Sequence, residues 1–156
     1  MIELSLFSIV VCGIFNVLIG FVWYHPKVFG TYWMKASGIS PETAEKGKKM
    51  MPVAVFCAFL AAMTIAWVLG FLGIAIGVYD WVGAVFDLAL WVWLGFIAPI
   101  LLGAVLWEGK PFKLYLVNSL YWLLALIVMS LVLFYGSVSP TPMQDEAHSQ
   151  EASIAE

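Results

Sequence analysis

Residues 16–33 read NVLIGFVWYHPKVFGTYW and contain the end of an apolar helix. The apolar part carries a single amide, Asn16, and an aromatic pair, Trp23 and Tyr24, follows it. His25-Pro26 then interrupts the helix, because proline disfavours the helical conformation of the residue before it. Aromatic residues are enriched where a membrane helix meets the lipid headgroups. The stretch is therefore typical of a membrane-spanning helix leaving the hydrocarbon layer.

The composition of the whole chain extends this interpretation to the other segments. Of 156 residues, 63% are apolar and 11% charged, and the mean hydropathy is +0.99. Soluble domains carry about 25% charged residues. The sequence therefore predicts one all-α domain over residues 1–136, a polytopic membrane protein with four transmembrane helices in an antiparallel bundle. The predicted spans are residues 4–24, 52–76, 82–107 and 112–135.

The charges predict the orientation. All seven basic residues are lysines, and they lie in residues 25–51 and 108–113. The positive-inside rule places these two loops in the cytoplasm and both termini outside. Residues 137–156 hold four acids and no base, which predicts a disordered acidic tail. Without arginine or a basic patch, a nucleic-acid partner is not expected.

Small residues at helical spacing predict where helices pack closely. In the first span Gly13, Asn16 and Gly20 share one face. In the second span small residues recur every four positions, which permits close helix crossing. These residues are Ala54, Ala58, Ala62, Ala66 and Gly70. The spacing is compatible with packing inside the chain or between two chains. The aromatic residues expected to anchor the cytoplasmic end at the headgroups are Trp23, Tyr24, Trp33 and Trp107.

The third span contains a carboxylate and a helix breaker. Pro99 removes the hydrogen bond to the carbonyl of Gly95, so a kink and a hinge are predicted at this pair. Asp87 lies roughly 9 Å inside the outer end of the span, where an unpaired charge costs a few kcal/mol or more. No basic residue lies at a comparable depth. Asp87 is therefore neutral, hydrated or at a subunit interface and is a candidate proton or cation site, or else it is a shallow carboxylate bonded to a Tyr or Trp.

Asn16 and Asn118 are the other candidate polar residues. Both fall in the cytoplasmic half of the predicted spans, where they either form an interhelical amide pair or line a polar cavity. His25 is the only histidine near the membrane, and no histidine lies at a depth where it could activate a serine or cysteine. The sequence therefore predicts no catalytic residue, no metal site and no cofactor.

Several motifs resemble one known family. They are GFVWYHPKVFGTYWMKASG at residues 20–38, WLGF at 93–96, WEGKPFK at 107–113, and the pair Asn118 and Tyr121. Over about residues 8–136 the chain resembles bacterial membrane proteins catalogued as domain of unknown function seventeen-sixty-one. The resemblance implies a four-helix protein of the bacterial inner membrane. It implies no activity, substrate or catalytic residue.

Two functions follow as expectations. The first is a non-enzymatic structural or partner-binding unit, which lies in the lipid bilayer and packs against a second copy or another membrane protein through its small-residue faces. The alternative is a subunit of a small oligomeric transporter or ion-conducting assembly, with Asp87 as its site and Gly95 and Pro99 as its hinge.

Overall fold

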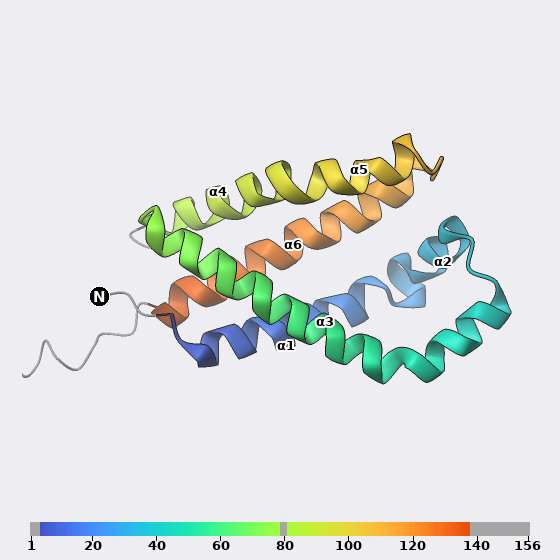
Figure 1. Cartoon of the computed structure of the whole chain (residues 1–156), viewed down its shortest axis with the longest axis horizontal. Coiled ribbons are helices and arrows are strands. Elements are labelled where there is room, and N and C mark those ends of the chain that lie inside the picture. Colours follow the sequence, from blue (N-terminus) through green and yellow to red (C-terminus); the bar gives the residue numbers. More distant parts are fainter. Residues whose placement is uncertain (1–3, 79–80, 138–156) are drawn as a thin grey trace, which may run out of the picture.

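A computed structural model describes residues 4–78 and 81–137 and shows an antiparallel bundle of helices (Figure 1). Four helical segments are long and apolar enough to cross a membrane, which confirms the predicted fold class. The predicted acidic tail lies outside the described residues. The segments are Leu6–Trp23, Glu42–Ala75, Val82–Leu106 and Phe112–Gly136.

The first span, α1 (Leu6–Trp23), ends at the aromatic stretch, as predicted. His25 is extended, with φ −64° and ψ 141°, as expected before a proline. A single wide turn, η1 (Pro26–Gly30), follows, and a short helix, α2 (Thr31–Ser37), ends at Gly38 in the left-handed conformation. Gly30 is required in this turn, because a Cβ there would overlap the backbone carbonyl oxygen of Tyr24.

The second span differs from the prediction at its start. Ser40 caps the next helix by accepting a hydrogen bond from the Thr43 N–H at 3.2 Å, as its sequence indicates. The helix, α3 (Pro41–Ala75), then continues through Pro52, so it begins eleven residues before the span predicted at residues 52–76. Figure 1 shows α3 bending in its blue-green part. Because this part of α3 is exposed, water or headgroups can satisfy the carbonyl that Pro52 leaves without a donor.

The third and fourth spans form the other side of the bundle. The third consists of α4 (Val82–Val92), a wide turn η3 (Trp93–Ile97), and α5 (Ala98–Leu106). The wide turn η3 contains Gly95 and ends two residues before Pro99, and the kink predicted at this pair stays a prediction. The fourth span, α6 (Phe112–Ser137), lies between α1 and the α4–α5 segment (Figure 1).

The tightest part of the core lies in the half of the bundle that contains the start of α1 and the end of α6. Residues from α1, α3, α4 and α6 meet there; they are Ile9, Cys12, Ala62, Ala66, Leu69, Leu88, Ala89, Leu126, Met129 and Leu133. In the other half, α3 becomes largely exposed from Met50 to Ala58. The bundle is therefore closed at one end and opens between α1 and α3 toward the other.

Both lysine-bearing loops lie at the open end. The Lys110 ammonium donates to the backbone carbonyl of Ser37 at 3.4 Å, and the Lys113 ammonium lies 4.8 Å from the centre of the Tyr32 ring. These contacts join the loop before α6 to α2. The two loops that the sequence assigns to one side of the membrane therefore meet.

Candidate functional site

Two tyrosine–asparagine hydrogen bonds connect α1 to α6 in the open half of the bundle. The Tyr121 hydroxyl donates to Asn16 Oδ1 at 3.1 Å and lies 3.4 Å from the Asn16 backbone carbonyl. The hydroxyl of Tyr24 donates to Asn118 Oδ1 at 3.1 Å. The predicted amide–amide pair is therefore wrong, because each asparagine bonds to a tyrosine on the opposite helix. Residue spacing predicts which face of a helix carries each asparagine. It does not predict how α1 and α6 are rotated relative to each other, and this rotation brings Tyr121 to Asn16 and Tyr24 to Asn118.

Aromatic rings surround these hydrogen bonds. The Tyr24 and Tyr121 ring centres lie 5.3 Å apart, and the Trp23 indole N–H donates to the Val117 carbonyl at 3.1 Å. Trp33 packs edge-on against Tyr24 with 5.4 Å between ring centres, whereas Trp107 is 87% exposed. Three of the four predicted interface anchors thus also pack against other parts of the bundle. Their position at the headgroups stays a prediction.

A cavity of about 350 Å³ lies beside this cluster, between α1, α3 and α6. Its polar residues are Asn16, Tyr24 and Tyr121, and its other walls include Gly20, Ala54 and Ala58. A Cβ on Gly20 would lie 3.4 Å from the Tyr121 hydroxyl oxygen, so the glycine leaves room for the tyrosine to reach Asn16.

Asn16 has an unused hydrogen-bond donor at this cavity. The residue is 3% exposed, and its Oδ1 accepts the bond from Tyr121. No described residue accepts a hydrogen bond from its Nδ2. The fully buried polar side-chain atoms without a partner among the described residues are the hydroxyl oxygens of Ser119 and Ser130, and Asn16 Nδ2 is not one of them. The amide N–H₂ is therefore accessible to an acceptor that enters the cavity.

The predicted small-residue stripe of α3 divides into two parts. Ala62, Ala66 and Gly70 are buried in the closed half. Ala54 and Ala58 are exposed and line the cavity. Because α1 and α3 approach closely only at their crossing, the small residues beyond the crossing leave space instead of making contact.

Gly13 marks the close approach of α1 to α3. A Cβ at this position would lie 2.6 Å from Phe59 Cε2 and 3.1 Å from Met63 Cγ. The Gly13 face of α1 therefore packs directly against α3, and a side chain at this position would require the Phe59 ring to move.

The residues predicted around Asp87 lie on the outer surface of the third span. Asp87, Trp91, Gly95 and Pro99 are all exposed. Asp87 makes no hydrogen bond or ion pair with any residue that the structure describes. A Cβ added at Gly95 would meet nothing within 4 Å. Asp87, Asn16 and Asn118 therefore do not form one site.

The opposite surface of this span is fixed to α6. The Trp93 indole N–H in η3 donates to the Ser119 carbonyl at 2.8 Å, and Val85, Leu88 and Ala89 are buried. The wide turn is thus held on its inner side, whereas its outer side is exposed. Hinge motion at Gly95 and Pro99 stays a prediction.

Metal-binding side chains do not gather within residues 4–78 and 81–137, where no group of three or more His, Cys, Asp or Glu comes together. His25 has a local role instead, since its Nδ1 accepts a hydrogen bond from the Lys27 N–H at 3.2 Å. His25 therefore caps the start of η1.

Sequence reasoning did not assign site roles to Tyr121 and Trp93. Each is an aromatic residue with a polar group inside an apolar span, and such groups usually find a hydrogen-bond partner when buried. The three-residue spacing between Asn118 and Tyr121 also indicates a shared helix face. This spacing is the feature of the sequence that indicates a polar role for Tyr121.

Comparison with known proteins identifies a family and adds no activity. No curated protein and no solved structure matches the chain. The sequence model of one family, described as "Protein of unknown function (DUF1761)", matches residues 7–134, most of the helical bundle. The chain therefore belongs to the DUF1761 family of proteins of unknown function.

Proposed function

We propose that the protein is a non-enzymatic assembly unit of the membrane, in which one four-helix bundle binds a second copy through an exposed surface that we call the assembly face. The assembly face consists of Asp87, Trp91, Gly95 and Pro99. The observation that carries the proposal is the exposed Asp87 carboxylate, which has no partner among the described residues. A carboxylate facing lipid within a span costs a few kcal/mol or more. A surface that covers Asp87 and supplies a hydrogen-bond donor removes much of this cost.

A second copy supplies such a donor. Trp91 lies one turn from Asp87 on the same face, is 68% exposed, and its indole N–H has no described acceptor. Helical side chains point toward the N-terminus of their helix, so the Trp91 indole extends toward the level of Asp87. Two copies related by a twofold axis along the membrane normal present identical residues at identical depth. The indole of each copy can then donate to the carboxylate of the other.

The shape of the face also favours helix association. Gly95 leaves open space on the outer surface beside the large Trp91 side chain. Small residues allow two helix backbones to approach in a membrane, where packing and hydrogen bonds drive association. The face thus carries a large side chain at Trp91 and open space at Gly95 one turn later. Two copies of such a surface can fit against each other.

The orientation and location belong to the same proposal. The meeting of both lysine-bearing loops at one end supports a cytoplasmic placement of that end, by the positive-inside rule. The protein then lies in the inner membrane of a bacterium, with both termini outside.

The proposal is tested by energy transfer between donor-labelled and acceptor-labelled copies in lipid vesicles, measured over a range of protein-to-lipid ratios. A Cβ at Gly95 would meet nothing within 4 Å, so Gly95→Leu adds bulk on the outer surface and is expected to weaken association at least tenfold, equivalent to about 1.4 kcal/mol. Ala61→Leu, at an exposed small residue of α3, is the matched control and should leave association unchanged.

Asp87→Leu tests the polar part of the proposal. The substitution removes both the acceptor and the cost of facing lipid in the separated copies, so both effects shift the equilibrium toward the monomer. A dissociation constant that is the same for the parent chain, Gly95→Leu and Asp87→Leu would contradict the proposal.

Transport is the second candidate, and the position of Asp87 favours it over an enzyme. A carboxylate on the face where two copies meet would lie at a subunit boundary, as a protonatable or cation-binding group requires. Proton or cation flux through vesicles containing the parent chain, lost in Asp87→Asn, would support transport. Equal flux in the parent, in Asp87→Asn and in protein-free vesicles would remove it.

A further inference from the structure

We infer that the cavity between α1, α3 and α6 binds a neutral, membrane-soluble compound whose carbonyl oxygen accepts a hydrogen bond from Asn16 Nδ2. The site lies away from the assembly face and does not depend on self-association. The inference rests on the free amide donor, the apolar walls of the cavity and the opening between α1 and α3.

The polar atoms of the cavity select an acceptor. The Tyr24 and Tyr121 hydroxyl hydrogens are donated to Asn118 and Asn16, so the tyrosine oxygens can accept further bonds and cannot donate them. The amide of Asn16 is then the free donor among the residues that line the cavity. Its natural complement is an oxygen without a hydrogen of its own, such as the carbonyl of a ketone or a quinone.

The remaining lining excludes ions and charged metabolites. The other lining residues are apolar, among them Val17, Phe21, Met51 and Val55, and no lining residue is charged. A charged ligand would lose its hydration without gaining a counter-charge. A volume of about 350 Å³ lies within the range of small-molecule sites, which starts at roughly 300 Å³.

The depth of Asn16 argues against an ordinary phospholipid. Asn16 is seven residues before Trp23, about 10 Å along the helix axis. If the aromatic stretch lies at the headgroups, the amide is well inside the hydrocarbon. A phospholipid ester carbonyl is held near the surface by its charged headgroup, whereas a neutral ketone can reach this depth.

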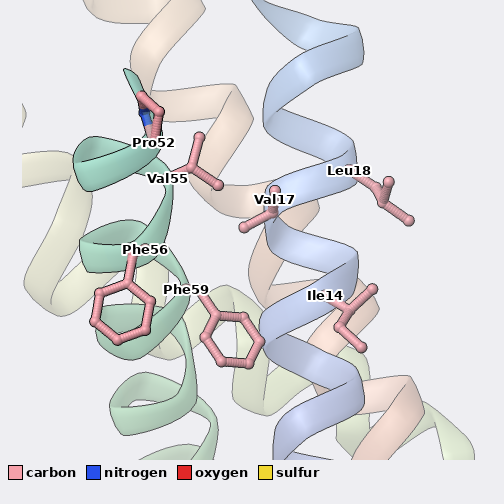
Figure 2. A pocket seen from close by; sticks show the side chains of 7 residues that line it. All are labelled: Ile14, Val17, Leu18, Pro52, Val55, Phe56 and Phe59. Carbon is pink, nitrogen blue, oxygen red and sulfur yellow. The ribbon is translucent and has the colours of Figure 1, made fainter. Parts of the chain in front are cut away.

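A neighbouring groove offers a place for an apolar chain. A second pocket, of about 300 Å³, lies between α1 and α3 and is lined only by apolar residues such as Ile14, Phe56 and Phe59 (Figure 2). Val17 and Val55 line both pockets and point toward each other across the gap between the helices (Figure 2). A ligand with its carbonyl at Asn16 can therefore extend an alkyl or isoprenoid chain past these valines.

Photolabelling of the full chain tests the inference. The probe is hexadecan-2-one carrying a diazirine and a terminal alkyne on its chain, and the matched probe is the same hydrocarbon without the carbonyl. The protein is reconstituted in vesicles of ether-linked phosphatidylcholine, which has no ester carbonyls. We expect saturable ketone labelling of peptides from α1 and α3, competed by unlabelled ketone, and weaker labelling by the hydrocarbon probe.

Three variants locate the binding. Asn16→Leu should weaken ketone binding roughly two- to tenfold and leave hydrocarbon binding unchanged, because one hydrogen bond is lost. Ala58→Leu fills the cavity from an exposed position of α3 and should remove most of the labelling. Ala61→Leu, on the same helix and outside both pockets, should label like the parent chain.

Three results would overturn the inference. The first is equal saturable labelling of the parent chain by both probes, and the second is unchanged labelling in Ala58→Leu. The third is competition by added ester-linked phosphatidylcholine, which would identify the occupant as bilayer lipid. If Asn16→Leu does not fold, the comparison of the two probes on the parent chain and the labelling of Ala58→Leu still test the inference. Loss of self-association would leave all of these results unaffected, so the two proposals fail separately.

Discussion

Gly13→Ala should destabilise the bundle at the crossing of α1 and α3. The added Cβ would lie 2.6 Å from Phe59 Cε2 and 2.8 Å from Phe59 Cδ2, whereas carbon atoms pack best at about 3.5–4.0 Å. The ring or the helix must therefore move by roughly 1 Å. Overpacking of this kind typically costs about 1–3 kcal/mol.

A second glycine isolates this cost from the change in helix propensity. A Cβ on Gly103 in α5 would make one ordinary contact, 3.7 Å from Trp107 Cδ1, so Gly103→Ala carries the propensity gain without the clash. The difference in free energy of unfolding between the two variants should therefore be about 1–3 kcal/mol. Phe59→Leu in the Gly13→Ala background should recover part of it, because a smaller side chain leaves room for the methyl group.

The assay is equilibrium unfolding in mixed micelles, followed by circular dichroism as the mole fraction of dodecyl sulfate increases. Gly13→Ala should unfold at a lower fraction than Gly103→Ala. Unfolding of both variants at the same fraction would refute the predicted overpacking at Gly13.

Two further substitutions test the polar cluster and the turn after α1. Tyr121→Phe removes the donor to Asn16 and should lower the free energy of unfolding by about 0.5–1.5 kcal/mol; a double-mutant cycle with Asn16→Leu that gives no coupling would rule out the bond. Gly30→Ala places a methyl group against the Tyr24 carbonyl oxygen and should accelerate tryptic cleavage in residues 25–39, whereas Gly47→Ala, with open space around it, should not. Equal cleavage rates in the two glycine variants would contradict the close approach of Gly30 to the Tyr24 carbonyl.

The sequence predicts the number and direction of the spans because each depends on local composition. Apolar length defines a span, and lysine placement defines which loops share a side. The capping of α3 by Ser40 follows from the residue types at a helix start. The continuation of α3 through Pro52 does not follow from residue types. It depends on whether solvent or headgroups can donate a hydrogen bond to the carbonyl that Pro52 leaves without a donor.

The details of the candidate site depend on geometry that spacing does not contain. Periodicity places Asn16 and Asn118 on helix faces, but the relative rotation of α1 and α6 decides that each amide meets a tyrosine. In the same way, the alanines of α3 are equivalent in spacing, and only the crossing point separates buried Ala62 from exposed Ala58. The angles and rotations between helices therefore decide the hydrogen-bond partners of the asparagines and the burial of the α3 alanines, which residue spacing does not predict.

Self-association through the assembly face is the central claim, and disulfide cross-linking in dilute proteoliposomes tests it most directly. Leu94→Cys places a thiol seven residues after Asp87, at a position that is 49% exposed. The background is Cys57→Ser, with the fully buried Cys12 retained. Phe56→Cys, on the 60% exposed surface of α3, is the matched control.

Mild oxidation should convert most of the Leu94→Cys chains to covalent dimers, whereas Phe56→Cys should remain monomeric. Adding Gly95→Leu should abolish the cross-link. Equal cross-linking at the two positions, or a stronger cross-link at Phe56→Cys, would show that the outer surface of the third span is not where two copies meet.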